Sequence, residues 1–152
     1  MDAFFIFSAK YSFVFAVGIL GVYFLTRRWP AQKRMALFAI PAGLLTYLLG
    51  FIANHLYYDP RPFVVDHFTP LIQHIADNGF PSDDTLLVAA LAAVGMYWNK
   101  WLGTILWALT ILVAVARVYV GVHHPIDVLS SIAFALIAVP AWYAIMNHVW
   151  KA

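Results

Sequence analysis

Residues 101–122 are WLGTILWALTILVAVARVYVGV, an almost unbroken apolar run with one charged residue, Arg117, near its end. A transmembrane helix needs about 20 largely apolar residues, so this run is long enough to cross a bilayer. Four further apolar runs lie at 3–25, 35–58, 82–98 and 125–149. The sequence therefore predicts an all-α integral membrane protein, a bundle of about five transmembrane helices.

The composition excludes the other broad classes of protein. Hydrophobic residues make up 64% of the 152 residues and charged residues 11%, with a mean hydropathy of +0.81, whereas soluble domains are about 45–50% apolar and disordered chains are more polar still. The net charge of +2 does not indicate a nucleic-acid partner, and the lack of cysteine excludes disulfides and thiol chemistry. We expect a single transmembrane domain over residues 1–152.

The charges predict how the helices are oriented. Basic residues flank the spans at three places: Arg27, Arg28, Lys33, Arg34, Lys100 and Lys151. Every acidic residue falls on the other side: Asp2, Asp59, Asp66, Asp77, Asp83, Asp84 and Asp127. The positive-inside rule places the basic side in the cytoplasm. We therefore expect a multi-pass protein of the plasma (inner) membrane with its N-terminus outside and its C-terminus in the cytoplasm.

One outer segment, 69–79 (TPLIQHIADNG), is too polar to span the membrane. Thr69 can cap a helix, Pro70 can occupy its first turn and Gly79 can end it. Leu71, Ile72 and Ile75 then share one face. The pattern predicts a short helix that lies in the outer interface.

Three polar clusters lie near the outer ends of the predicted spans: NHLYYDPRPF (54–63), FPSDDT (80–85) and ARVYVGVHHPID (116–127). Each has an ordinary explanation when taken singly, with Arg61 and Arg117 as interface anchors, Ser82 as a helix cap and His123 as an interfacial histidine. Together they bring two arginines, two helix N-termini and a histidine–aspartate pair to one face, which favours a functional site.

This combination of groups suits a phosphoryl group. Arginine offers paired hydrogen bonds to phosphate oxygens, and the helix start at Ser82 offers free backbone N–H groups. His123 can attack phosphorus if a carboxylate, here Asp127, orients its ring. The sequence predicts phosphoryl transfer at the outer face. No haem or metal cofactor is expected, since no metal-ligand spacing supports a metal site at Asp83, Asp84 and His123.

The clusters resemble the three motifs of the type 2 phosphatidic acid phosphatase superfamily, K-x6-RP, PSGH and SR-x5-H-x3-D, in the same order. In the first, Arg61 and Pro62 are present and Asn54 stands where the family has lysine. The segments PRPF, FPSD and RVYVGVHHPID are most similar to the bacitracin-resistance branch, whose members are undecaprenyl pyrophosphate phosphatases. The resemblance covers about residues 54–127.

In the second motif Pro81 and Ser82 are present, but Asp83 replaces glycine and Asp84 replaces histidine. In the third the spacing of arginine, histidine and aspartate is intact, and Ala116 replaces the serine. The resemblance covers all three motifs, and their combination is specific because chance recurrence in a short membrane protein is improbable.

The resemblance implies a role for each matching residue. His123 is the nucleophile that becomes phosphohistidine, and Asp127 orients it. Arg61 and Arg117 hold the phosphoryl oxygens, with Ser82 and the backbone N–H of Asp83 beside them. Asn54 donates a hydrogen bond without the charge of a lysine. No cofactor is implied.

Asp84 stands where the family has the histidine that protonates the leaving oxygen. Three explanations are open: Asp84 acts as the acid in its protonated form, the leaving group needs little help, or the site binds lipid phosphates with little turnover. His67, His74 and His124 could also supply the proton.

The resemblance and the chemistry together favour a membrane lipid-diphosphate phosphatase that acts on undecaprenyl pyrophosphate. A diphosphate expels a phosphate monoester, whose second pKa is about 6, so it depends less on an acid than a monophosphate does. The alternatives are a phosphatidylglycerophosphate or phosphatidate phosphatase and a catalytically weakened lipid-phosphate binding protein.

The predicted orientation can be tested with single cysteines, because the chain has none of its own. A cysteine introduced near Asp66 or His74 should react with a membrane-impermeant thiol reagent in intact cells, and one near Gln32 should not. The reverse labelling pattern would contradict both the orientation and an outward-facing site.

Overall fold

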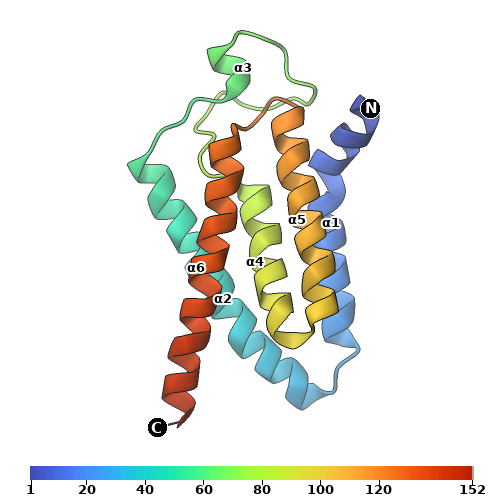
Figure 1. Cartoon of the computed structure of the whole chain (residues 1–152), viewed down its shortest axis with the longest axis vertical. Helices are drawn as coiled ribbons and strands as arrows, with labels where there is room; N and C mark the ends of the chain where they lie inside the picture. The colour runs from blue at the N-terminus through green and yellow to red at the C-terminus, as the bar shows by residue number, and fades with distance from the viewer. Residues whose placement is uncertain (152) are drawn as a thin grey trace.

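The computed structural model describes the backbone of residues 1–151 and the side chains of residues 1–148, so the side chain of Lys151 lies outside the described residues. Its helices are α1 (Asp2–Leu25), α2 (Trp29–Leu56), α3 (Pro62–Val65), α4 (Asp83–Trp98), α5 (Lys100–Tyr119) and α6 (Pro125–Lys151). The five long helices run along the bundle, and the single turn of α3 lies in a loop beyond one end (Figure 1). The predicted all-α membrane fold is confirmed.

The central helix is α4, which packs against α1, α2, α5 and α6. Each of α1, α2, α5 and α6 is long and apolar enough to cross a membrane, whereas α4 has 16 residues. Figure 1 shows that α4 begins deeper in the bundle than the neighbouring ends of α5 and α6. The five predicted spans are thus four helices of membrane length around a shorter one.

Two helix ends differ from the sequence prediction by three residues or more. The first residue of α2 is Trp29, earlier than the predicted residue 35, because Pro30 can occupy the first turn of a helix without the loss of a hydrogen bond. The last residue of α5 is Tyr119, not Val122, because Gly121 takes a φ of 81°, which favours glycine. This turn leads the chain from α5 towards α6.

The helix predicted for residues 69–79 is wrong, because this segment is irregular and the only short helix at this end of the described chain is α3. The backbone N–H of Leu71 donates to the carbonyl of Val120 at 3.0 Å. The side chain of Ile72 is 5% exposed and packs with Ala116 and Val120. Contacts with the end of α5 therefore replace the helical hydrogen bonds that the local pattern favoured.

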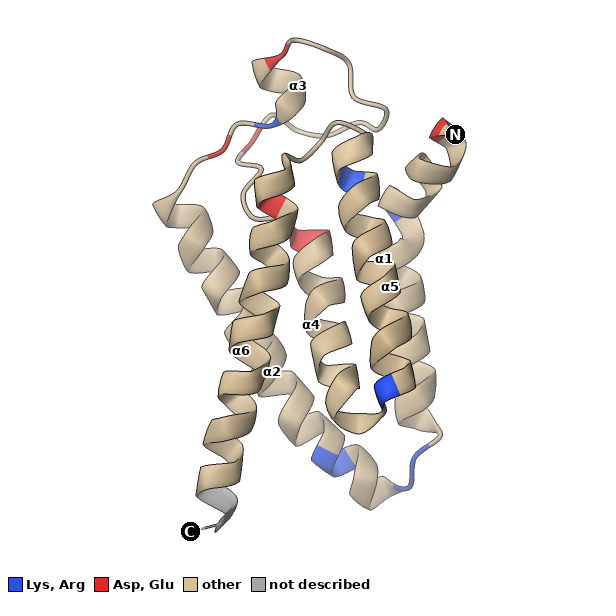
Figure 2. Cartoon of the chain, viewed as in Figure 1, with Lys and Arg blue, Asp and Glu red and all other residues tan. Residues whose placement is uncertain are grey.

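The two ends of the bundle carry opposite charges, as the sequence predicted. Figure 2 shows aspartates at one end, called the acidic end below, and most of the lysines and arginines at the other. Asp2 belongs to the acidic end, because its carboxylate accepts a hydrogen bond from the Tyr119 hydroxyl at 2.8 Å. Three basic residues are exceptions to this separation. Arg61 and Arg117 are buried and pair with Asp77 and Asp84, and Lys10 lies about two helical turns after Asp2 in α1.

Small residues bring α4 and α5 close together. A Cβ atom on Gly103 would lie 2.7 Å from the Cα of Met96, and one on Gly95 would lie 3.4 Å from the Cα of Gly103. Close approach of this kind is a common means of packing helices in membranes. The tight α4–α5 hairpin fixes the position of the α4 N-terminus relative to Arg117 on α5.

The substitution Gly103→Ala should therefore destabilise the protein by about 1–3 kcal/mol, the usual cost of overpacking. Gly18→Ala is the matched control, since a Cβ there would meet nothing within 4 Å. Thermal unfolding in detergent should show a lower midpoint for Gly103→Ala and an unchanged or higher one for Gly18→Ala. Equal midpoints would contradict the close approach of α4 and α5.

Candidate active site

His123 lies at the centre of a buried cluster at the acidic end. Its side chain is 3% exposed, and its Nε2 atom lies 3.3 Å from Arg61 Nη1 and 3.2 Å from Arg117 Nη2. Its Nδ1 atom lies 3.2 Å from the Asp127 carboxylate. If Nδ1 carries the proton and donates to Asp127, the lone pair of Nε2 faces the two guanidinium groups.

The surroundings of His123 keep its ring uncharged near neutral pH. Burial lowers the pKa of His123 below its ordinary value, and the charges of Arg117 and Arg61 act in the same direction. The hydrogen bond with Asp127 opposes this shift. A neutral imidazole has a free lone pair on Nε2, which is the form that a nucleophile requires.

Asp127 is fixed by several contacts in the first turn of α6. The carboxylate is fully buried and also accepts the backbone N–H of His124 at 2.9 Å. The Ser131 hydroxyl bonds to the carbonyls of Asp127 and Ser82, at 2.9 and 2.8 Å. These contacts tie the start of α6 to the residue before α4, so the carboxylate that orients His123 has a defined position.

The two arginines are buried, and some of their N–H groups already have hydrogen-bond partners. Arg61 is 5% exposed and donates to Asp77 at 2.6 Å and to the carbonyl of Val122 at 2.9 Å. Arg117 is 7% exposed and forms an ion pair with Asp84 at 2.8 Å. Its buried Nε–H has no hydrogen-bond partner among the described residues. A buried cation with an unused donor is suited to bind an anion.

Ser82 and Asn54 contact the protein itself. The Ser82 hydroxyl is buried and pairs with the Thr85 hydroxyl at 3.0 Å. The Asn54 side chain donates to the carbonyl of Phe80 at 2.7 Å, so it holds the segment that leads into α4.

Asp83 is the first residue of α4, and the first backbone N–H groups of a helix have no partner within it. These N–H groups lie near Arg117, because Asp84 in the same turn of α4 pairs with that arginine.

Asp84 contacts Arg117, which the sequence could not show. Its carboxylate lies 2.8 Å from Nη1 of Arg117 and is about a quarter exposed. A phosphate that binds Arg117 must compete with this carboxylate. The residue that stands at the position of the family's acid is therefore a counter-ion to the buried Arg117.

His74 and Asp77 complete the site and belong to a loop whose sequence carries no recognisable motif. His74 Nε2 lies 3.3 Å from Arg117 Nη2, and Asp77 pairs with Arg61. Burial lowers the pKa of His74, and the charges of Arg61 and Arg117 lower it further. Aspartate and histidine are common in polar loops, so their place in this site depends on the path of residues 66–82.

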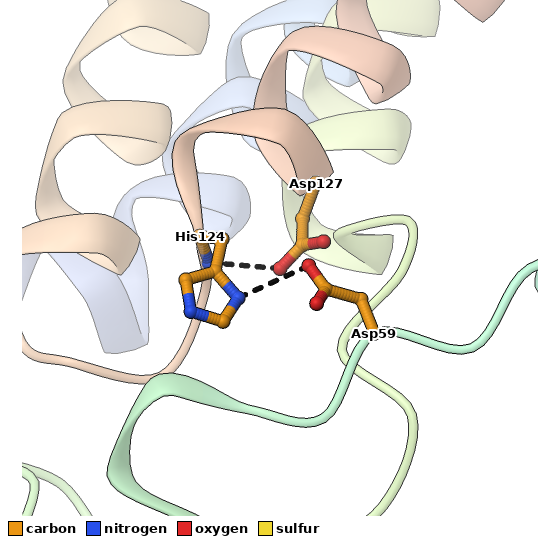
Figure 3. A group of neighbouring side chains, drawn as sticks. All are labelled: Asp59, His124 and Asp127. Atoms are coloured by element: carbon orange, nitrogen blue, oxygen red, sulfur yellow. Dashed lines mark hydrogen bonds and ion pairs between the residues drawn. The ribbon is translucent and has the colours of Figure 1, made fainter. Parts of the chain in front are cut away.

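Asp59 and His124 form a second carboxylate–imidazole pair next to Asp127 (Figure 3). The Asp59 carboxylate lies 3.0 Å from His124 Nδ1. Burial, followed by the charge of Asp127, raises the pKa of Asp59. One oxygen or nitrogen from each of the three residues lies within 4.8 Å of the others. Asp127 Oδ2 also faces His123, and His124 Nδ1 bonds to Asp59, whereas Asp127 Oδ1 has no hydrogen-bond partner among the described residues.

The cluster can therefore hold an anion between two arginines, beside a neutral and oriented imidazole. That arrangement meets the needs of phosphoryl transfer to a histidine, in which charge stabilisation and positioning supply most of the catalysis. The structure brings together Arg61, Arg117, His123, Asp127 and Asp84. Ser82, Asp83 and Asn54 lie around this group and support the start of α4.

The comparisons with known proteins identify the family of this chain. Residues 36–151 match the model of the PAP2 superfamily. Undecaprenyl-diphosphatase BcrC of Bacillus subtilis (strain 168) is 31% identical over 137 residues, which are 90% of this chain and 70% of BcrC. The putative undecaprenyl-diphosphatase YbjG of Escherichia coli (strain K12) is 31% identical over 108 residues, and this chain covers 54% of its length.

A solved structure is similar over almost the whole chain. LpxE of Aquifex aeolicus matches with a TM-score of 0.77 and 25% sequence identity, over 94% of this chain and 85% of LpxE. The helices of the two proteins are therefore arranged in a similar way. The chain belongs to the PAP2 superfamily, in its bacitracin-resistance-type branch.

Proposed function

We propose that this protein hydrolyses undecaprenyl pyrophosphate to undecaprenyl phosphate at the outer face of the plasma membrane. The observation that carries the proposal is the position of His123, whose Nε2 atom lies between Arg61 and Arg117 while Nδ1 faces Asp127. The two arginines bind the terminal phosphoryl group, and His123 attacks its phosphorus atom. The phosphohistidine that forms is then hydrolysed by water.

A groove beside the site supports a lipid substrate. It has a volume of about 390 Å³ and lies between α2 and α4, with a mostly apolar lining. Asp83 and Asp84 line one end of it, and Leu91 lies two helical turns further along α4. A lipid whose phosphate binds Arg117 can place the first part of its chain in this groove, where apolar contacts with α2 and α4 stabilise it.

Two observations favour a diphosphate over a monophosphate. The named relatives BcrC and YbjG are an undecaprenyl-diphosphatase and a putative one. Asp84 is a counter-ion to Arg117, so the position that would protonate the leaving oxygen carries no imidazole. A phosphate monoester leaves as an anion more readily than an alkoxide. The competing functions, a lipid-monophosphate phosphatase and a lipid-phosphate binding protein, are outcomes of the experiment below.

The nucleophile can be tested by substitution of His123. His123→Ala should lower phosphate release from undecaprenyl pyrophosphate by more than about 10³-fold, as expected for loss of a nucleophile. Asp127→Asn should cost less, because Asp127 orients the ring and does not attack. Arg61→Lys and Arg117→Lys should each slow turnover, because lysine cannot replace a planar fork.

His55→Ala is the matched control, because His55 is exposed at the end of α2 and bonds to the carbonyl of Phe51. The readout is phosphate release by purified protein from a polyprenyl diphosphate and from a lipid monophosphate. Faster release from the monophosphate would favour the second enzyme function. Tight binding without release from either would favour the binding protein. Near-normal activity of His123→Ala would disprove the phosphohistidine mechanism.

Because Asp84 and phosphate compete for Arg117, removal of the Asp84 charge should raise the affinity of the site for phosphate. Asp84→Asn should lower the inhibition constant of inorganic phosphate about tenfold, equivalent to about 1.4 kcal/mol, because Arg117 loses its counter-ion. Asp84→His removes the same charge and adds an acid, so it should also raise turnover, most of all on a monophosphate. Asp66→Asn removes an exposed charge from the same end and should change neither value. Unchanged inhibition in Asp84→Asn would contradict the competition.

A further inference from the structure

A second histidine contacts the phosphate-binding arginines. His74 Nε2 lies 3.3 Å from Arg117 Nη2, and this same nitrogen lies 3.2 Å from His123 Nε2. The centroids of the two imidazole rings are 6.3 Å apart, with 74° between the ring planes. A phosphoryl oxygen held by Nη2 of Arg117 is therefore flanked by His123 and by His74.

The fold holds His74 in this position. Leu71 bonds to the backbone of Val120, and Ile72 is buried against the end of α5, two residues before His74. The Nδ1 atom of His74 lies 3.3 Å from the carbonyl of Ile75, to which it donates. Nε2 accepts a hydrogen bond from Arg117 Nη2. A proton taken up by the neutral ring is carried on Nε2 once a phosphoryl oxygen takes over the Arg117 N–H group.

The other candidate proton donors are engaged elsewhere. Asp84 is paired with Arg117, and Asp77 with Arg61. His124 bonds to Asp59 next to Asp127, on the side of the site that orients the nucleophile. His67 is exposed in the turn after α3 and forms no side-chain hydrogen bond within the described part of the chain. His74 combines contact with Arg117 through Nε2 and access to solvent.

Solvent reaches His74 through a cleft of about 680 Å³, which Phe63, Pro70 and Ile75 also line. The side chain of His74 is half-buried. A proton donor for a lipid phosphatase must exchange protons with water between turnovers, and water must also enter to hydrolyse the phosphohistidine. The cleft gives water access to His74.

We propose that His74 is the general acid of this phosphatase, in place of the family histidine that Asp84 replaces. The proposal deepens the function proposed above and rests on it. His123 Nε2 forms a bond to phosphorus, and the bond between phosphorus and the lipid oxygen breaks. The electron pair stays on the lipid oxygen, which takes the Nε2 proton of His74.

The second half of the reaction restores both histidines. His74 takes a proton from water as the water oxygen attacks phosphorus, and the phosphorus–nitrogen bond breaks with its electron pair returning to His123. The products are inorganic phosphate and the lipid phosphate, or the lipid alcohol if the substrate is a monophosphate. His74 ends the cycle protonated and His123 ends it neutral.

The charges around His74 couple its protonation to substrate. Arg61, Arg117 and His123 face it from three segments, and Asp77 is the nearby acid. In the empty site burial and the arginines lower the pKa of His74. A phosphoryl group bound to both arginines neutralises their charge and so raises that pKa again. The rate should therefore fall as the pH rises through the pKa of His74 in the complex.

The test compares substrates whose leaving groups differ in their need for a proton. In His74→Asn, kcat on a lipid monophosphate should fall about 100-fold, at the lower end of what general acids contribute. The loss should be smaller on a polyprenyl diphosphate and slight on nitrophenyl phosphate, whose leaving group is a stable anion. KM should change little, and the decline of kcat at high pH should disappear.

His67→Asn is the matched control. It removes an exposed imidazole from the same loop, and asparagine tolerates the φ of 54° found there. It should leave all three rates unchanged. His74→Gln provides a second variant if His74→Asn does not fold.

The outcomes separate this proposal from the function itself. Equal losses on all three substrates would mean that His74 has only a structural role, and unchanged rates would mean that another group supplies the proton. Either result overturns the role of His74 and leaves the phosphatase function standing. Folded wild-type protein that hydrolyses none of the three substrates would overturn both.

Discussion

The buried guanidinium of Arg117 is the interaction on which this end of the molecule depends. A charge removed from water costs several kcal/mol unless partners replace the lost solvation. Asp84, His74 and His123 surround it from three different segments, and its Nε–H remains unused among the described residues. A cation that is only partly neutralised inside an apolar bundle has a strong affinity for an anion, and it draws the ends of α4, α5 and α6 together.

The short helix α4 makes this arrangement possible. Because α4 begins deeper in the bundle than its neighbours (Figure 1), Asp84 in its first turn meets Arg117 in the last turn of α5. A helix of full membrane length would carry that turn beyond the arginine. The close approach of α4 and α5 at Gly103 sets the depth of α4, so packing at one end of the bundle positions polar groups at the other.

The polar loops were harder to predict than the helices. Long apolar runs and the separation of charge identify a membrane bundle, because no soluble fold can bury so much apolar surface. The helix predicted for 69–79 failed because local signals at Thr69 and Pro70 compete with tertiary contacts. Leu71 bonds to the backbone of Val120, and Ile72 is buried against α5. These two contacts also bring His74 to Arg117.

The sequence by itself determined that Arg117, His123 and Asp127 would meet, because all three lie within one short segment. A histidine four residues before an aspartate, at the start of a helix, can reach its carboxylate whatever the rest of the chain does. The tertiary structure alone decided that Asp84 neutralises Arg117 and that His74 lies beside His123. These partners are far apart along the chain, and only the packing of α4, α5 and the loop 66–82 sets the distance between them.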